Sequence, residues 1–149
     1  MTRTHLTAVA DLEFQLAPQP WTAAMLADEL IAGAHARVLL AADGVVTGHV
    51  VTRALLDEWH LMILGVARGH QRRGWGRRLL ADALQTARNR DGTRMLLEVR
   101  VTNQPAIALY RKQGFLELHR RRNYYTCPRP EDALVMALEL ASDAGHHSR

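Results

Sequence analysis

The sequence predicts a single domain of the α/β (α+β) class, in which helices flank a sheet of mixed strand direction. Three features of the chain predict this class. Two β-type runs are joined at Asp43-Gly44, a residue pair typical of a two-residue hairpin turn, so these strands should pair antiparallel. Residues 59–101 show a strand, helix, strand pattern, which requires a parallel crossover. Residues 115–140 hold two further alternating strands.

Two helices are expected before the first strand. Apolar residues have helical spacing over residues 9–16, and Pro18 ends the pattern. A second helix should begin after Thr22, which suits the N-cap position, and end before Gly33. Its predicted apolar face consists of Met25, Leu26, Leu30 and Ile31.

The middle of the chain supplies three strands and the longest helix. The hairpin strands are predicted at 37–42 and 45–55. The run at 59–66 is continuously apolar, so we expect a strand buried on both faces. A helix should follow Gly74 and stop near Asp91-Gly92, because its apolar residues form one stripe with charged residues opposite. The stripe consists of Leu79, Leu80, Ala83, Leu84 and Ala87.

The last third of the chain adds one helix and three strands. A second apolar run at 95–101 completes the crossover. A helix with Pro105 in its first turn should end at Gly114. Strands at 115–125 and 133–140 then alternate, joined by a proline-containing loop.

Composition limits the function classes. The net charge of +4 comes almost entirely from arginine, since Lys112 is the only lysine. Cys127 is the only cysteine, which excludes an intramolecular disulfide, and no Cys/His spacing indicates a metal site. The chain has no signal-peptide pattern and no run of about 18 apolar residues, so we expect a cytoplasmic protein without a membrane partner. One domain should cover residues 1–149, with 141–149 as a disordered tail.

A basic, glycine-punctuated turn over residues 71–76, here named the cradle, lies between the run at 59–66 and the long helix. A helix start leaves backbone N–H groups without intrahelical partners and carries partial positive charge, so an anion fits there. Gly74 and Gly76 have no Cβ and allow a close approach. The spacing matches neither the Walker nor the dinucleotide-binding pattern. The residues alone leave two interpretations open, a phosphate site and an ordinary helix start with solvated arginines.

The order of motifs provides a resemblance. After the cradle come Leu97-Glu98-Val99-Arg100-Val101-Thr102-Asn103 and Ala108-Leu109-Tyr110-Arg111-Lys112-Gln113-Gly114-Phe115. In this order the chain resembles the GNAT superfamily of acetyl-CoA-dependent N-acetyltransferases. Arg121-Arg122-Asn123-Tyr124-Tyr125 and Glu131-Asp132-Ala133 are similar to the RimI-type branch, the ribosomal-protein-alanine N-acetyltransferases.

The resemblance implies a mostly antiparallel sheet whose two central parallel strands splay apart to admit the pantetheine arm of acetyl-CoA. It implies that strand backbone binds the pantetheine, that the cradle amides take the pyrophosphate, and that Asn103 hydrogen-bonds the cofactor. The residues so implied in cofactor binding are Leu64, Gly65, Val66, Gln71, Arg72, Arg73, Gly74, Trp75, Gly76, Arg77 and Asn103.

Glu98 is the predicted general base. It shares one face of an otherwise apolar strand with Leu96 and Arg100. An ion pair with Arg94 or Arg100 is the structural alternative, because buried carboxylates are usually paired. The resemblance to the RimI-type pattern implies that this glutamate acts on the acceptor amine through a water. At pH 7, removing the proton from an α-amine of pKa roughly 7.8 costs about 1 kcal/mol, whereas removing it from a lysine of pKa about 10.4 costs about 4.6 kcal/mol. The smaller cost favours an N-terminal acceptor.

Tyr110 has the position of the family's general acid, which protonates the departing CoA thiolate; ordinary helix packing is the alternative. A backbone N–H from the strand that ends at Val66 would meet the oxyanion. The resemblance assigns Asn123, Tyr124 and Tyr125 to the acceptor peptide site. The histidines do not pair with carboxylates at a recognisable spacing, and His70, beside the cradle, is the rival base.

We therefore expect acetyl transfer from acetyl-CoA to the N-terminal α-amine of a protein, the N-terminal alanine of a small-subunit ribosomal protein, by direct attack. Two alternatives remain open: acetylation of a small-molecule amine, and a catalytically silent acetyl-CoA-binding or partner-binding domain. Nucleic-acid binding is not expected, because no stripe interleaves aromatic and basic residues. The chain departs from the family pattern at Ile63, at Arg68 and in its short N-terminal stretch, which concerns the acceptor pocket.

Overall fold

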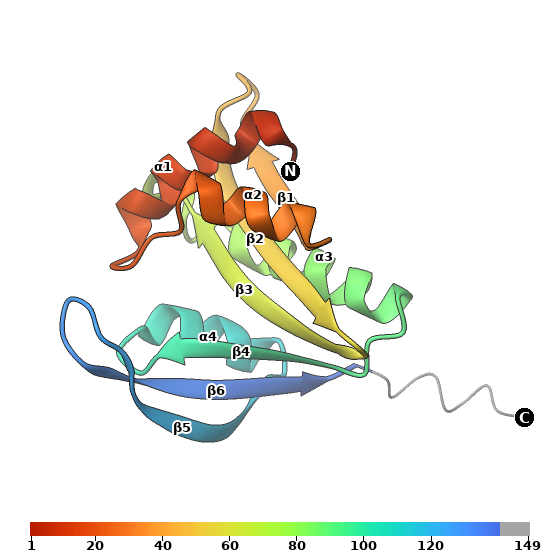
Figure 1. Ribbon diagram of the computed structural model, residues 1–149, viewed down its shortest axis with the longest axis vertical. Coiled ribbons are helices and arrows are strands. Elements are labelled where there is room, and N and C mark those ends of the chain that lie inside the picture. The colour runs from red at the N-terminus through yellow and green to blue at the C-terminus, as the bar shows by residue number, and fades with distance from the viewer. Residues whose placement is uncertain (141–149) are drawn as a thin grey trace, which may run out of the picture. The chain divides into compact units, whose positions relative to one another are not determined.

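The computed structural model describes residues 1–140, so the predicted disordered tail at 141–149 lies outside the described residues. Six strands form one sheet in the order β1-β2-β3-β4-β6-β5, as the predicted mixed α/β class requires (Figure 1). The chain divides into two compact units. The first unit holds Met1–Arg53 and Leu61–Ala83, and the second holds Ala54–His60 and the residues from Leu84 onward. Each unit is described by itself, and the single-domain organisation stays a prediction.

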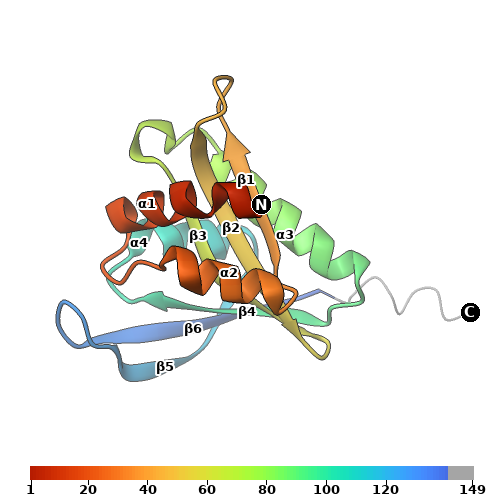
Figure 2. The same cartoon turned by 45° about the horizontal axis from the view of Figure 1, so that its top comes forward.

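The first unit begins with helices. A short 3-10 helix, Arg3–His5, leads into α1 (Leu6–Leu16), and α2 (Ala23–Ile31) follows after a proline-containing turn. Thr22 caps α2 as predicted, because its hydroxyl accepts a hydrogen bond from the Met25 backbone N–H at 3.2 Å. Both helices lie side by side over the strands of this unit (Figure 2). Among the described residues the first strand is β1, so residues 1–34 supply helices and turns to this unit.

The predicted apolar face of α2 is only partly correct. Leu26 is buried with Leu6, Val9 and Val51 in the core of the first unit. Met25 and Ile31, however, are 43% and 74% exposed. A helix as short as α2 buries only a narrow stripe against its neighbours, and apolar residues beside that stripe stay at the surface.

The predicted antiparallel hairpin is confirmed, but its turn is longer than the two residues expected, because the last bond across it runs from the Ala41 N–H to the Val45 carbonyl. β1 (His35–Leu40) and β2 (Val46–Leu55) pair antiparallel, and Gly44 has a φ of +86° in the turn between them. β3 (Glu58–Val66) follows, but the prediction that it is buried on both faces was wrong. Trp59 and Leu61 are buried, while the residues from Met62 onward are only partly buried. A run of apolar residues shows that the side chains can be buried, but it does not show how much neighbouring surface is available to cover them.

The long helix α3 (Trp75–Asn89) matches its prediction closely. All five residues of the predicted stripe are buried. The helix ends at a tight turn in which Asp91 has a φ of +61°. Gly92 fits there because a Cβ at this position would lie 2.6 Å from the Trp59 ring.

The second unit contains the crossover and the two C-terminal strands. β4 (Arg94–Arg100) runs parallel to β3 and pairs through Glu58–His60 of that strand. Pairing covers the start of each strand, as an expected splayed pair requires. β6 (Glu131–Glu139) pairs antiparallel with β4 on one side and with β5 (Leu116–Tyr125) on the other. The helix α4 (Gln104–Lys112) connects β4 to β5 (Figure 1).

The paired strands β4 and β6 have two different faces. One face carries large apolar side chains that are buried in the core, Met95, Leu97, Val99, Leu134 and Met136. The other face carries Glu98 and Arg100 of β4. Glu98 lies level with Val135 of β6, and Arg100 lies level with Ala133. The alternation of a strand therefore directs Glu98 away from the apolar core of its own unit.

Candidate active site

The cradle lies in the first unit, directly after β3. A short 3-10 helix, Arg68–His70, leads into it, and the first helical hydrogen bond of α3 runs from the Arg78 N–H to the Gly74 carbonyl at 3.1 Å. The amides of Trp75, Gly76 and Arg77 precede that bond, so they have no acceptor within the helix. Amides of this kind suit an anion, as the phosphate interpretation of the cradle requires.

The backbone of the cradle has left-handed residues at two positions. Gly74 has a φ of +84°, as expected for a glycine at such a turn, and Arg72 also has a positive φ, +64°. The Gln71 side chain donates a hydrogen bond to the Val66 carbonyl at 2.9 Å, which ties the turn to the end of β3. Leu64, Gly65 and Val66, the predicted pantetheine residues, thus lead into a turn of fixed geometry.

Arginine side chains surround the cradle. Arg72, Arg73, Arg77 and Arg78 are exposed. The Arg78 guanidinium lies over the Trp75 ring, 5.3 Å from its centroid, and therefore remains at the helix start. Positive charge and unpaired amides point to the same class of ligand, a phosphate or pyrophosphate.

A buried histidine–carboxylate contact lies in this unit, between residues too far apart in the chain to show the recognisable spacing that was sought in the sequence. Nε2 of His49 lies 2.9 Å from Oε2 of Glu13, and both side chains are buried. The other Glu13 oxygen accepts a hydrogen bond from the Trp21 N–H at 3.2 Å. A Cβ on Gly65 would lie 2.7 Å from His49, so only glycine allows this packing. The two partners are 36 residues apart, a spacing that sequence reasoning cannot recognise.

Glu98 belongs to the second unit and is paired, but not with the predicted partners. Its Oε2 lies 3.8 Å from Nη1 of Arg121 on β5. Arg94 pairs instead with Glu58, at 2.7 Å. The Glu98 side chain is 23% exposed, so the carboxylate is accessible as well as paired. A carboxyl group that an amine or a water can reach suits a general base.

Tyr110 lies on α4 and is 8% exposed. Its ring packs at a tilt against Phe115, with ring centroids 5.8 Å apart. Burial, and to a lesser extent the neighbouring Tyr125, raise the pKa of the Tyr110 phenol above its ordinary value. The phenol therefore holds its proton at neutral pH, and proton transfer to a thiolate is more uphill than for an ordinary tyrosine.

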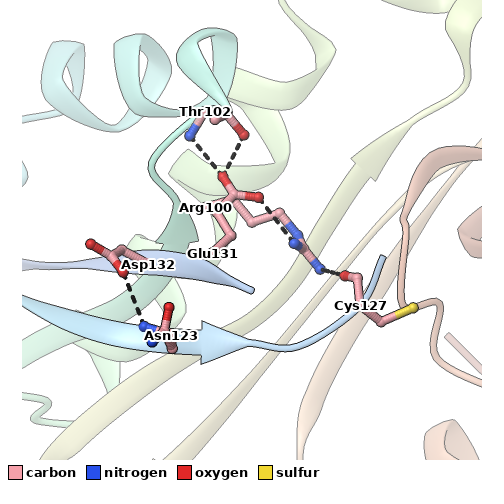
Figure 3. Close-up of polar contacts among 6 residues, drawn as sticks. All are labelled: Arg100, Thr102, Asn123, Cys127, Glu131 and Asp132. Atoms are coloured by element: carbon pink, nitrogen blue, oxygen red, sulfur yellow. Dashed lines mark hydrogen bonds and ion pairs between the residues drawn. The ribbon is translucent and has the colours of Figure 1, made fainter. Parts of the chain in front are cut away.

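A bulge near the end of β5 explains the Asn-Tyr-Tyr run. Asn123 has a φ of +48°, and its N–H donates a hydrogen bond to Oδ1 of Asp132 at 3.0 Å (Figure 3). The register between β5 and β6 shifts between Arg121 and Tyr125. As a result Tyr124 and Tyr125 are in edge contact, with centroids 5.0 Å apart, and the Arg121 guanidinium lies 4.3 Å from the Tyr124 centroid. Glu98, Arg121, Tyr124 and Tyr125 together are here named the acceptor cluster.

A second network holds the loop between β5 and β6 (Figure 3). Arg100 donates to Oε1 of Glu131 at 3.1 Å and to the Cys127 carbonyl at 2.7 Å. The other Glu131 oxygen accepts hydrogen bonds from the Thr102 N–H, at 3.0 Å, and from its hydroxyl. These hydrogen bonds, first of all those from Thr102, hold the pKa of Glu131 below its ordinary value.

Tyr125 links this network to the acceptor cluster. The Arg100 guanidinium lies 4.2 Å from the Tyr125 ring centroid. Burial raises the pKa of Tyr125 to about 12, and the Tyr124 and Glu98 groups add to the effect. The Tyr125 phenol is therefore a neutral group beside Glu98, able to hydrogen-bond a peptide without competing for the amine proton.

Asn103 has a structural role that the sequence did not predict. It is the N-cap of α4, and its Oδ1 accepts a hydrogen bond from the Ala106 N–H at 3.3 Å. The cap uses the side-chain oxygen. A contact with the cofactor would use the amide NH₂ group, and it stays a prediction.

The structure thus divides the predicted site residues between the two units. The pantetheine residues and the cradle belong to the first unit, whereas Asn103, Tyr110 and the acceptor cluster belong to the second. Arg121, Glu131 and Asp132 were not predicted as functional residues. The acidic pair that opens β6 after a proline-containing loop was the signal that could have found the latter two.

Two kinds of feature are absent from residues 1–140. This part of the chain holds no group of three or more His, Cys, Asp or Glu residues that could bind a metal ion. It also holds no helix that is long and apolar enough to cross a membrane.

Comparison with known proteins gives three results. A profile of the acetyltransferase (GNAT) family matches residues 6–115. The ribosomal protein bS18-alanine N-acetyltransferase of Salmonella typhimurium is 42% identical over 103 residues, which cover 68% of this chain and 70% of that protein. The protein of the same name from Escherichia coli K12 is 34% identical over 139 residues, 93% of each chain.

The crystal structure of the ribosomal-protein-S18-alanine N-acetyltransferase from Escherichia coli has a TM-score of 0.86 to this chain at 34% identity. The superposition covers 94% of this chain and 90% of that chain. The profile match spans the cradle, Glu98 and Tyr110, and the longer matches extend to most of the chain.

Proposed function

The chain belongs to the acetyltransferase (GNAT) family and is an acetyl-CoA-dependent N-acetyltransferase of the RimI type, and from this premise we propose that its acceptor is a protein N-terminus. The acceptor we propose is the N-terminal alanine of a small-subunit ribosomal protein; the names of the Salmonella and Escherichia coli relatives state an alanine of ribosomal protein bS18. We propose a cytoplasmic location, since a ribosomal-protein acceptor would be met there.

One observation carries the proposal. At the bulge of Asn123, Tyr124 and Tyr125 are in contact with each other, and Arg121 links Tyr124 to Glu98. Asp132 holds the bulge and Glu131 holds the following loop (Figure 3). Aromatic side chains with polar tips suit a peptide, because they supply contact area and hydrogen bonds to a backbone at low entropic cost. A base beside such a surface suits a peptide amine.

The proposed reaction is direct transfer. The acceptor amine attacks in its neutral form: its nitrogen bonds to the thioester carbonyl carbon of acetyl-CoA and gives one proton, through a water, to Glu98. The C–S bond breaks, and the sulfur takes a proton from Tyr110. A backbone N–H at the end of β3 would stabilise the oxyanion. Tyr110 regains its proton as the enzyme resets.

Donor binding is proposed for the residues of the first unit. The amides at the start of α3 and the surrounding arginines suit the pyrophosphate of acetyl-CoA. Leu64, Gly65 and Val66 supply backbone groups for the pantetheine. Glycine at position 65 is required by packing against His49, so this position serves the fold as well as the cofactor.

The acceptor is tested directly with peptides. We expect the enzyme to transfer acetyl from acetyl-CoA to the α-amine of a hexapeptide that begins Ala-Arg, detected by mass spectrometry and by CoA release. The matched control is the same hexapeptide with an acetylated N-terminus and one internal lysine, which should not react. CoA release with small amines such as spermidine, and none with the peptide, would show that the acceptor is a small molecule. Absence of transfer to every amine would favour a silent domain.

A further inference from the structure

Arg121 makes two contacts that hold its charge beside the proposed general base. Its guanidinium lies 3.8 Å from Oε2 of Glu98 and over the face of Tyr124. The side chain is 50% exposed, so the cation is at the surface of the cluster and not buried within it. Its neighbour Arg120 turns instead toward Asp132, at 3.8 Å.

The strand register explains how a residue of β5 reaches a residue of β4. Arg121 pairs with Ala133 of β6, and Glu98 pairs with Val135 of the same strand. Paired residues share a face of the sheet, so the Arg121 side chain crosses β6 above a small residue to meet the carboxylate. The contact therefore results from the geometry of three strands.

The position of this cation matters for an amine acceptor. A protonated amine would form a favourable ion pair with Glu98, but an ammonium has no lone pair and cannot attack the thioester. Arg121 already occupies this carboxylate and repels a second cation, whereas it does not repel a neutral amine. The arrangement therefore penalises the unreactive form of the acceptor more than the reactive form.

We propose that Arg121 is a positioning residue that acts through Glu98: its guanidinium disfavours an ammonium beside the carboxylate, so that the neutral amine is the form of acceptor the site holds. This inference rests on the proposed function. It adds a residue to the reaction without adding a chemical step, since the proton still leaves the amine toward Glu98.

Other groups in the second unit titrate or carry charge near this face. His60 lies level with Leu96, and His119 lies level with Val135. The other titratable or charged groups near this face are Arg100, Tyr110, Tyr125 and Glu131. A substitution at Arg121 leaves all of them in place, so a difference between variant and wild type reports the charge at position 121.

The test compares Arg121→Gln with the wild type at two pH values, using the Ala-Arg hexapeptide. At pH 6.5 the loss of one like charge near the amine should lower both kcat and KM about fourfold, because more acceptor binds as ammonium. At pH 9 an α-amine of pKa roughly 7.8 is mostly neutral, and the two enzymes should agree within about 1.5-fold. If Arg121→Gln lowered kcat by the same factor at both pH values, the inference would be overturned.

Two charge controls and a ligand control accompany this comparison. Arg121→Lys keeps the charge and should restore the wild-type pH dependence, while Arg122→Gln removes a charge one residue along the strand and should not change it. An N-acetylated Ala-Arg hexapeptide without lysine carries no amine, so it should bind both enzymes equally. A lysine variant that behaves as the glutamine variant would contradict the proposal.

Folding and acceptor identity are checked separately. Arg121→Met retains an apolar stem against Tyr124 and replaces the glutamine variant if that protein does not fold, as judged by thermal unfolding. If the wild type does not acetylate the peptide at all, the proposed function fails and the inference with it. If the wild type acetylates the peptide and the ratio of kcat values does not change with pH, only the role of Arg121 fails.

Discussion

The cradle and the acceptor cluster are built in opposite ways. The cradle is a contiguous stretch, residues 71–76, whose binding groups are mainly backbone amides at the start of α3. The acceptor cluster takes its side chains from β4 and β5, and β6 holds them in register. A site made of backbone depends on local conformation, whereas a site made of side chains depends on individual residues. Substitutions in the cradle should therefore change mainly the KM for acetyl-CoA, whereas substitutions in the acceptor cluster should change mainly kcat.

The largest effect is expected at the proposed base. Glu98→Gln keeps the shape of the side chain but cannot accept a proton, so kcat should fall about a thousandfold at pH 7 with the hexapeptide. The KM for acetyl-CoA should hardly change, because the cradle does not depend on Glu98. Glu117→Gln, an exposed substitution on β5, is the control. Unchanged turnover in Glu98→Gln would remove the base assignment.

The second effect concerns the proton donor. Tyr110→Phe removes the hydroxyl and keeps the ring that packs on Phe115, so the fold should remain and kcat should fall about a hundredfold. The measurement is steady-state kinetics together with thermal unfolding. A variant with normal stability and normal kcat would show that Tyr110 is only a packing residue.

A smaller effect is expected in the cradle. Gly74 has a φ of +84°, and a Cβ there would meet the Arg77 side chain only at 3.9 Å, so Gly74→Ala introduces backbone strain without a clash. We expect the KM for acetyl-CoA to rise about tenfold with kcat within about twofold of wild type. Gly44→Ala carries the same kind of strain in the hairpin turn, at a φ of +86°, and should leave this KM unchanged. Equal effects of both substitutions would contradict the cradle's role.

The smallest effect is a pH dependence of stability at Glu131. The folded protein holds the pKa of this carboxyl below its ordinary value, chiefly through hydrogen bonds from Thr102. The resulting stabilisation is present above the ordinary pKa of a glutamate and is lost as the pH falls through the lower pKa of the folded state. Glu131→Gln should therefore unfold at a lower temperature than the wild type at pH 7, and the gap should narrow toward pH 3.

The control for this comparison is Glu139→Gln at the other end of β6, where the side chain is exposed. The difference in unfolding temperature between Glu139→Gln and the wild type should not depend on pH. If the difference in unfolding temperature between Glu131→Gln and the wild type stays constant from pH 7 to pH 3, the carboxylate charge does not stabilise the loop.

The secondary structure was largely predictable because its signals are local. Thr22 caps α2 through its own first turn, and the stripe of α3 repeats within a single helix. Two predictions of burial failed, for Met25 and Ile31 on α2 and for the second face of β3. Both concern how much neighbouring surface covers an element, and this quantity is not written in the element's own residues.

The sequence by itself predicted the elements and the cradle, because spacing along the chain carries these features, and its resemblance to the GNAT family predicted Glu98 and Tyr110 as catalytic residues. Only the tertiary structure decided the partners: Arg121 for Glu98, Glu131 for Arg100, and Glu13 for His49. Such pairs depend on strand register, and a bulge such as that at Asn123 changes which side chains share a face. No periodicity encodes a register shift, so residues far apart in the chain find their partners only when the sheet is formed.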